Sequence, residues 1–112
     1  MPSQFPHADD NWYTIGSHTL YYEEQQTVVV VDQRVVPLTP LHMKLLKPLL
    51  SCKSVGDGRL ARHAYKSVAM PEIVKNIERQ VREMNNRLEP HGLTITRVAK
   101  RAFQLTEIPE PE

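Results

Sequence analysis

The chain has 112 residues, of which 40% are hydrophobic and 24% are charged, and its formal net charge at pH 7 is +1. This length suffices for one domain with a single modest core and excludes two independent cores. No apolar run approaches the roughly 18–20 residues that a membrane helix needs, and the N-terminus lacks the pattern of a secretion signal, so we expect a cytoplasmic protein. The single cysteine, Cys52, excludes an internal disulfide.

The charges are unevenly distributed along the chain. All 14 Lys and Arg residues lie between Arg34 and Arg101, where only five acids occur, and the flanks carry the other eight acids. A basic segment between acidic ends favours an anionic partner such as nucleic acid. A solvated helix surface of mixed charge accounts for the same pattern equally well.

Residues 1–12 are polar and contain two prolines and two aspartates, so we expect a disordered tail or linker there. We expect one domain over residues 13–107 and an acidic tail over 108–112. The domain begins with four short segments rich in β-branched and aromatic residues, namely 13–15, 19–22, 28–31 and 35–38. The polar stretches between them predict turns, and the whole predicts a small antiparallel meander.

A first helix is predicted after these strands. Thr39 supplies an N-cap oxygen, and Pro40 suits the first helical position because its missing N–H would be unsatisfied there. Leucines then recur at helical spacing, with lysines on the other face. Pro48 removes a backbone hydrogen bond two turns later, so we expect a bend there with helix on both sides.

Two further helices and a hairpin complete the prediction. Asp57 is the expected N-cap of a second helix that buries Leu60, Ala64 and Tyr65. Pro71 opens the third and longest helix, whose buried stripe is predicted to be Ile73, Ile77, Val81, Met84 and Leu88. After Pro90 and Gly92, alternating apolar residues predict two strands over about 93–106 around the basic tip "VAKRA".

The predicted fold is therefore α+β: an N-terminal antiparallel β-sheet, three helices and a C-terminal β-hairpin. From residue 15 to 105 the chain resembles the DNA-binding effector domain of OmpR/PhoB-type response regulators, a winged helix-turn-helix. The resemblance rests on "LTP" (38–40), the leucine pair 45–46, Leu60 with Tyr65, and "IERQVREMNNRLEP" (77–90). The chain differs in having Ala102 and Phe103 where the family has a Gly-Tyr pair, and nothing in these 112 residues resembles a receiver domain.

This resemblance implies sequence-specific binding of double-stranded DNA in transcriptional regulation. The helix at about 71–89 would enter the major groove, and the hairpin wing would lie on the minor groove or the backbone. The implied contacts are Lys75, Asn76, Arg79, Arg82 and Asn86 on that helix, Arg59 and Arg62 on the second helix, and Lys100 and Arg101 at the wing tip. Arg82 and Asn86 are the preferred base-reading residues, because Arg pairs with guanine and Asn with adenine.

Two other classes of function stay open. Winged helices also serve as protein docking modules, and the family can contact RNA polymerase through a loop that the connector 51–57 matches. If the chain instead binds DNA, a homodimer on repeated half-sites is a further expectation. An enzyme is disfavoured, because the chain has no Gly-rich phosphate loop and no paired-carboxylate motif. The five histidines are too scattered to predict a metal site, so neither a metal nor a cofactor is expected.

Overall fold

The computed structural model describes residues 11–109. The expected tail over 1–12 and the acidic tail over 108–112 therefore lie mostly outside the described residues. The elements are, in chain order, β1 (Trp12–Ile15), β2 (His18–Glu23), β3 (Val28–Val31), β4 (Arg34–Pro37), α2 (Pro40–Ser51), β5 (Val55–Gly56), α3 (Asp57–Leu60), the π-helical turn η1 (Ala61–Tyr65), α4 (Pro71–Leu88), the 3₁₀ turn η2 (Glu89–His91), β6 (Leu93–Ala99) and β7 (Ala102–Glu107).

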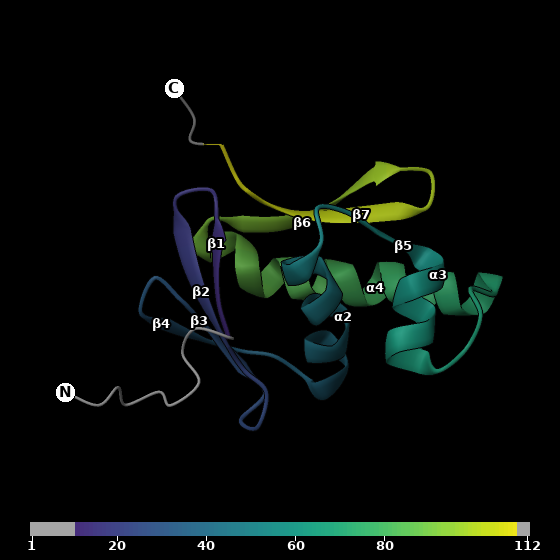
Figure 1. Cartoon of the computed structure of the whole chain (residues 1–112), viewed down its shortest axis with the longest axis horizontal. Helices are drawn as coiled ribbons and strands as arrows, with labels where there is room; N and C mark the ends of the chain where they lie inside the picture. The colour runs from purple at the N-terminus through teal and green to yellow at the C-terminus, as the bar shows by residue number, and fades with distance from the viewer. Residues whose placement is uncertain (1–10, 110–112) are drawn as a thin grey trace.

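The N-terminal meander is confirmed. Strands β1 to β4 form an antiparallel sheet in sequence order, which lies at one end of the molecule in Figure 1. The turn between β3 and β4 has two central residues, Asp32 and Gln33, both with positive φ (50° and 72°). That conformation matches the right-handed twist of the flanking strands, and it fixes the pairing of Val31 with Arg34.

Helix α2 begins as the sequence predicts. The Thr39 hydroxyl accepts a hydrogen bond from the His42 backbone N–H at 3.1 Å, and His42 Nδ1 accepts one from the Thr39 N–H at 3.3 Å, which completes a capping box. The helix continues through the buried Pro48 to Ser51, so the chain is helical on both sides of this proline. The bend expected at Pro48 stays a prediction.

The start of the second helix differs from the prediction. The N-cap is Gly56, and Asp57 is the first residue of α3. Asp57 cannot cap the helix because its carboxylate is bound by Arg97 and its backbone N–H donates to the Arg101 carbonyl at 2.7 Å. The α-helix lasts only four residues before the π-helical turn, and of the three residues expected inside, only Leu60 is fully buried.

Helix α4 has the predicted buried stripe. Four of its five expected members are buried, and Ile73 is half-buried against the core, while Lys75, Arg79 and Arg82 are exposed. The helix ends at Leu88, and the chain turns at Gly92, whose φ of +87° favours glycine.

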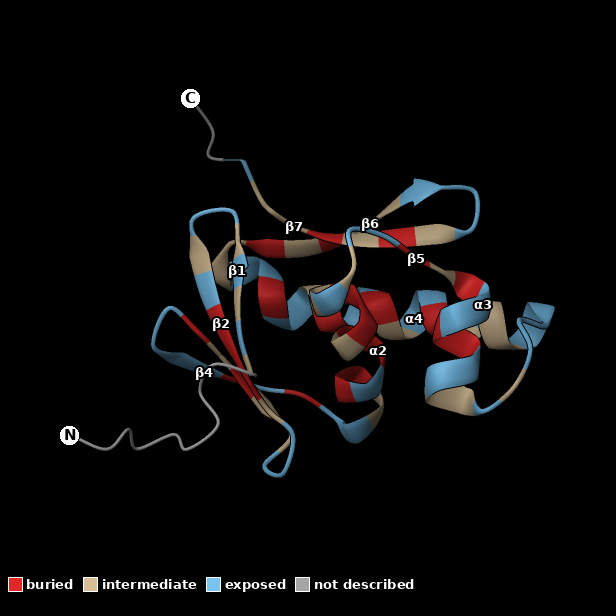
Figure 2. Cartoon of the chain, viewed as in Figure 1, coloured by how far each residue is buried: buried red, intermediate tan, exposed pale blue. Residues whose placement is uncertain are grey.

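The C-terminal hairpin is confirmed and forms a second sheet of order β5-β7-β6. Strand β5 was not predicted, because two residues are too short to carry a pattern. The hairpin runs along α4 with its tip near α3 (Figure 1). Figure 2 shows the buried residues on the inner sides of the helices and both sheets, where they form one core cluster.

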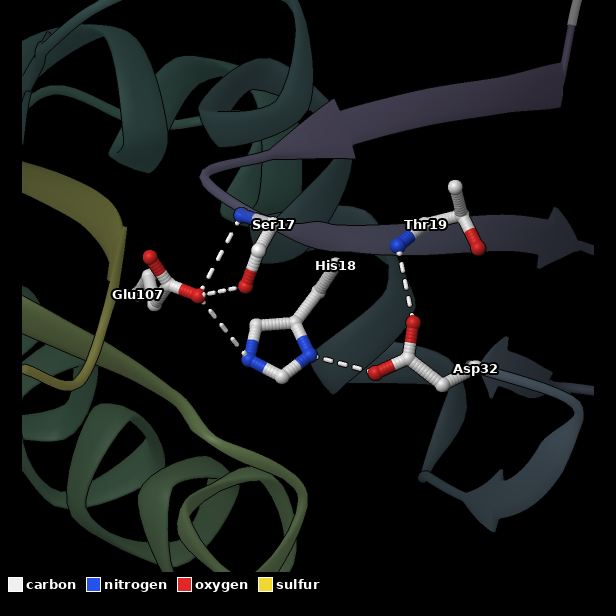
Figure 3. A network of polar contacts seen from close by, with 5 residues as sticks. All are labelled: Ser17, His18, Thr19, Asp32 and Glu107. Atoms are coloured by element: carbon white, nitrogen blue, oxygen red, sulfur yellow. Dashed lines mark hydrogen bonds and ion pairs between the residues drawn. The ribbon is translucent and has the colours of Figure 1, made fainter. Parts of the chain in front are cut away.

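A polar network joins the two sheets (Figure 3). The imidazole of His18 on β2 lies between the carboxylates of Asp32 and Glu107, at 3.3 Å from the latter. The hydrogen bond from His18 lowers the pKa of Asp32, and the hydrogen bond from the Ser17 hydroxyl lowers that of Glu107. Both carboxylates therefore stay ionised until the pH falls below their usual range, so this link between the sheets persists in mild acid.

Candidate functional site

One face of α4 is free of the core and carries most of the predicted contacts. Lys75, Arg79, Arg82 and Asn86 are all exposed. With 3.6 residues per turn, these four positions fall within about 60° of one another around the helix axis, opposite the buried Ile77. Three cations and one amide thus form a single outward stripe along the helix.

The tip of the β6–β7 hairpin lies beside the N-terminal half of this helix. Lys100 and Arg101 are exposed at the turn between the two strands. Together with Lys75 they line an open groove of about 500 Å³, to which α3 contributes Asp57 and Gly58. The fold therefore brings cations from positions 75, 100 and 101 to one surface.

The same groove contains two acids, Asp57 and Glu78, and Arg97 pairs with both. Arg97 lies 3.3 Å from the Asp57 carboxylate and 2.9 Å from that of Glu78. From the sequence, Arg97 received no role in the site. A signal was available, because Arg97 continues the inward alternation of Leu93 and Ile95, where a charged side chain needs a partner.

Asn85 is a second residue that the sequence did not single out. Its side-chain amide donates to the Ile95 carbonyl at 2.9 Å and accepts from the Ile95 N–H at 2.8 Å. This pair of bonds holds β6 against α4 in the manner of a neighbouring strand. The helical period places Asn86, but not Asn85, in the outward stripe, and no local pattern indicates that Asn85 would bind β6.

The remaining predicted contacts lie to the side of the stripe. Asn76 is half-buried, and its side-chain oxygen accepts a hydrogen bond from the Tyr65 hydroxyl. Arg59 and Arg62 are exposed on α3 and η1, and Arg59 donates to the Cys52 sulfur at 3.1 Å. These two arginines do not line the groove beside the hairpin tip.

A buried histidine of α2 lies next to α4. His42 on α2 is 1% exposed, and its Nε2 has no hydrogen-bond partner among residues 11–109, with Glu83 Oε1 at 3.6 Å. Because Nδ1 accepts the capping hydrogen bond, it carries no proton in the neutral ring. Burial lowers the pKa of His42, although the Glu83 carboxylate acts in the opposite direction and Arg87 adds to the lowering. Protonating Nδ1 would therefore both charge a buried ring and break the capping box.

We expect His42 to make the protein less stable in weak acid. A histidine with a lowered folded pKa stabilises the fold fully above its unfolded pKa of about 6.5, and this contribution is lost as pH falls below that value. One proton gives a slope of up to about 1.4 kcal/mol per pH unit. His42→Gln keeps a capping side chain that does not titrate, so its free energy of unfolding should fall less between pH 7 and 5. Urea unfolding of both proteins measures this, and parallel pH curves would contradict it.

Within residues 11–109, no group of three or more His, Cys, Asp or Glu side chains is arranged to hold a metal ion. No helix in this part of the chain is long and apolar enough to cross a membrane. No known family model matches the chain, and no curated protein shows significant similarity to it.

Proposed function

We propose that this protein is a winged helix-turn-helix domain of the OmpR/PhoB type that binds double-stranded DNA sequence-specifically in transcriptional regulation. The observation that carries the proposal is the outward stripe of α4 next to the basic hairpin tip. In this arrangement α4 is the recognition helix and the β6–β7 hairpin is the wing. The core stripe on the opposite side of α4 leaves the polar stripe available to a partner.

The chemistry of the stripe supports base reading as well as attraction to phosphates. An α-helix fits the major groove, where an arginine pairs with guanine through two hydrogen bonds and an asparagine does so with adenine. The side chains of Arg82 and Asn86 are exposed and have no hydrogen bond or ion pair to other described residues, so they are available for such contacts. Lys75, Lys100 and Arg101 are exposed cations, which suits them to contacts with phosphates or with a narrow minor groove.

A protein docking module is the second candidate, and one observation favours it. The segment between η1 and α4 exposes Val68 and Met70, which are 67% and 46% accessible. Apolar side chains of this size suit a protein surface better than a phosphate backbone. RNA polymerase or another regulator would be the partner in that case, and the affinity for DNA would be low.

Selection of bound sequences from random duplex DNA at moderate salt tests the proposal. We expect an enriched motif, which supplies a preferred duplex for titration. The cations at the site make about four to seven phosphate contacts plausible, so log affinity should fall with log salt with a slope of about −4 to −6. No enriched motif together with a slope near zero would refute DNA binding and favour docking.

A further inference from the structure

Arg97 lies where three elements of the candidate site meet. From β6, its Nη1 lies 3.3 Å from both carboxylate oxygens of Asp57 on α3, and its Nη2 lies 2.9 Å from Glu78 Oε2 on α4. Nη1 also donates to the Lys100 carbonyl at 3.1 Å, in the hairpin tip itself. One guanidinium thus connects α3, α4 and the basic tip.

The surroundings of Arg97 hold its side chain in place. Its guanidinium carbon lies 4.1 Å from the centre of the Phe103 ring on β7, so the charged group packs against an aromatic side chain. Asp57 is only 3% exposed and needs a charged partner. A lysine could not replace Arg97 here, because a single ammonium lacks the planar set of donors that reaches two carboxylates and a carbonyl together.

The hairpin tip is held to α3 by contacts that do not involve Arg97, whereas the Arg97 side chain also connects it to α4. The Asp57 N–H donates to the Arg101 carbonyl at 2.7 Å, and β5 pairs with β7 beside it. These bonds fix the tip relative to α3. The bond between Arg97 and Glu78 is the contact of this network that fixes it relative to the α4 stripe.

We propose that Arg97, through Glu78, is a positioning residue that sets the spacing between the hairpin tip and the α4 stripe, and so determines selectivity for the preferred duplex. The inference rests on the proposed DNA-binding function. A helix in the major groove and a hairpin on the neighbouring backbone must fit one duplex simultaneously, so their separation has to match it. If the tip is no longer held at this distance from α4, its cations still attract the phosphates of any duplex. They then no longer add to the affinity for the preferred duplex that the base contacts of α4 provide.

The test is Glu78→Gln, because charge and positioning predict different results for it: loss of the charge alone leaves the ratio of affinities for preferred and scrambled duplexes unchanged, and loss of positioning lowers it. Removing an acid from the groove strengthens attraction to all DNA. If Glu78 positions Arg97, the ratio of affinities for preferred and scrambled duplexes should nevertheless fall about two- to fivefold, the size of effect that an exposed charge pair supports. Glu72→Gln is the matched control: it removes the same charge from the first turn of α4, where Glu72 is not an ion-pair partner of Arg97, and should leave the ratio unchanged.

A measurement without DNA accompanies the binding assay. Amide hydrogen exchange over residues 98–102 should be faster in Glu78→Gln than in the unaltered protein and in Glu72→Gln, since the tip has lost one anchor. Arg97→Lys should show the same two effects more strongly, and thermal unfolding verifies that it is folded. If Arg97→Lys does not fold, the result for Glu78→Gln alone decides.

The outcomes separate this inference from the proposed function. If the unaltered protein binds no duplex, DNA binding and the inference that rests on it both fail. If it binds selectively and Glu78→Gln retains the full affinity ratio, the inference alone is overturned, whatever the exchange rates show. A ratio that falls equally in Glu72→Gln would assign the effect to charge and would also overturn the positioning role.

Discussion

Met84→Ala is expected to lower the free energy of unfolding by about 2–5 kcal/mol, the usual cost of truncating a large side chain in a packed core. Met84 is fully buried in the stripe of α4 that faces the core. The loss combines the apolar surface that is no longer removed from water with the cavity left behind. For a chain of this size it corresponds to a fall in Tm of roughly 10–20 °C, measurable by circular dichroism.

Met70→Ala is the matched control for this prediction. Met70 immediately precedes the same helix but is 46% exposed, so its truncation should change the free energy of unfolding by only about 0.5 kcal/mol. The contrast tests whether Met84 packs in the core while the residue before the helix does not. Similar losses for the two methionines, or a larger loss for Met70, would contradict the burial of Met84.

Arg82→Ala is expected to cost about 1–3 kcal/mol of binding free energy on the preferred duplex, if Arg82 makes a two-bond contact with a guanine. The preference at one base position should relax, while binding to scrambled DNA hardly changes. Titrations of the variant on both duplexes measure this difference. Equal losses on both DNAs would remove Arg82 from the base-reading residues.

The double variant Lys100→Ala/Arg101→Ala tests the hairpin tip, as Arg82→Ala tests α4. These side chains would contact phosphates or the minor groove, so their loss should weaken binding to both duplexes and make the salt slope shallower by roughly one to two. Arg34→Ala is the control, because it removes a cation from the four-stranded sheet at the opposite end of the molecule (Figure 1). No loss for Arg82→Ala and none for the double variant would refute DNA binding.

The sequence predicted the elements whose patterns are local. The strands of the meander alternate or cluster β-branched residues, Thr39 and Pro40 mark a helix start, and the apolar residues of α4 recur with the helical period. Each of these signals depends on neighbours within a few positions of the chain. The exposed cations of α4 followed from the same period, since they occupy the positions left over by the buried stripe.

The predictions from the sequence were wrong or incomplete where segments distant in the chain meet. Aspartate is a favoured N-cap residue, but the Asp57 carboxylate pairs with Arg97, 40 positions later, and the Asp57 N–H donates to the Arg101 carbonyl in the hairpin tip. An isolated helix would gain from the cap, whereas the folded chain instead satisfies a buried charge, which is the larger requirement. For the same reason β5 was missed: two residues become a strand only because β7 lies next to them.

The sequence by itself thus determined the strands and helices apart from β5, which side of α4 is buried, and where the positive charge is concentrated. Only the tertiary structure decided that the hairpin tip lies beside the N-terminal half of α4, with Arg97 between them, and that Asn85 holds β6. The physical reason is the range of the interactions. Helical and strand periods are set by backbone geometry a few residues at a time, whereas a guanidinium shared by α3, α4 and a hairpin depends on how the whole core packs.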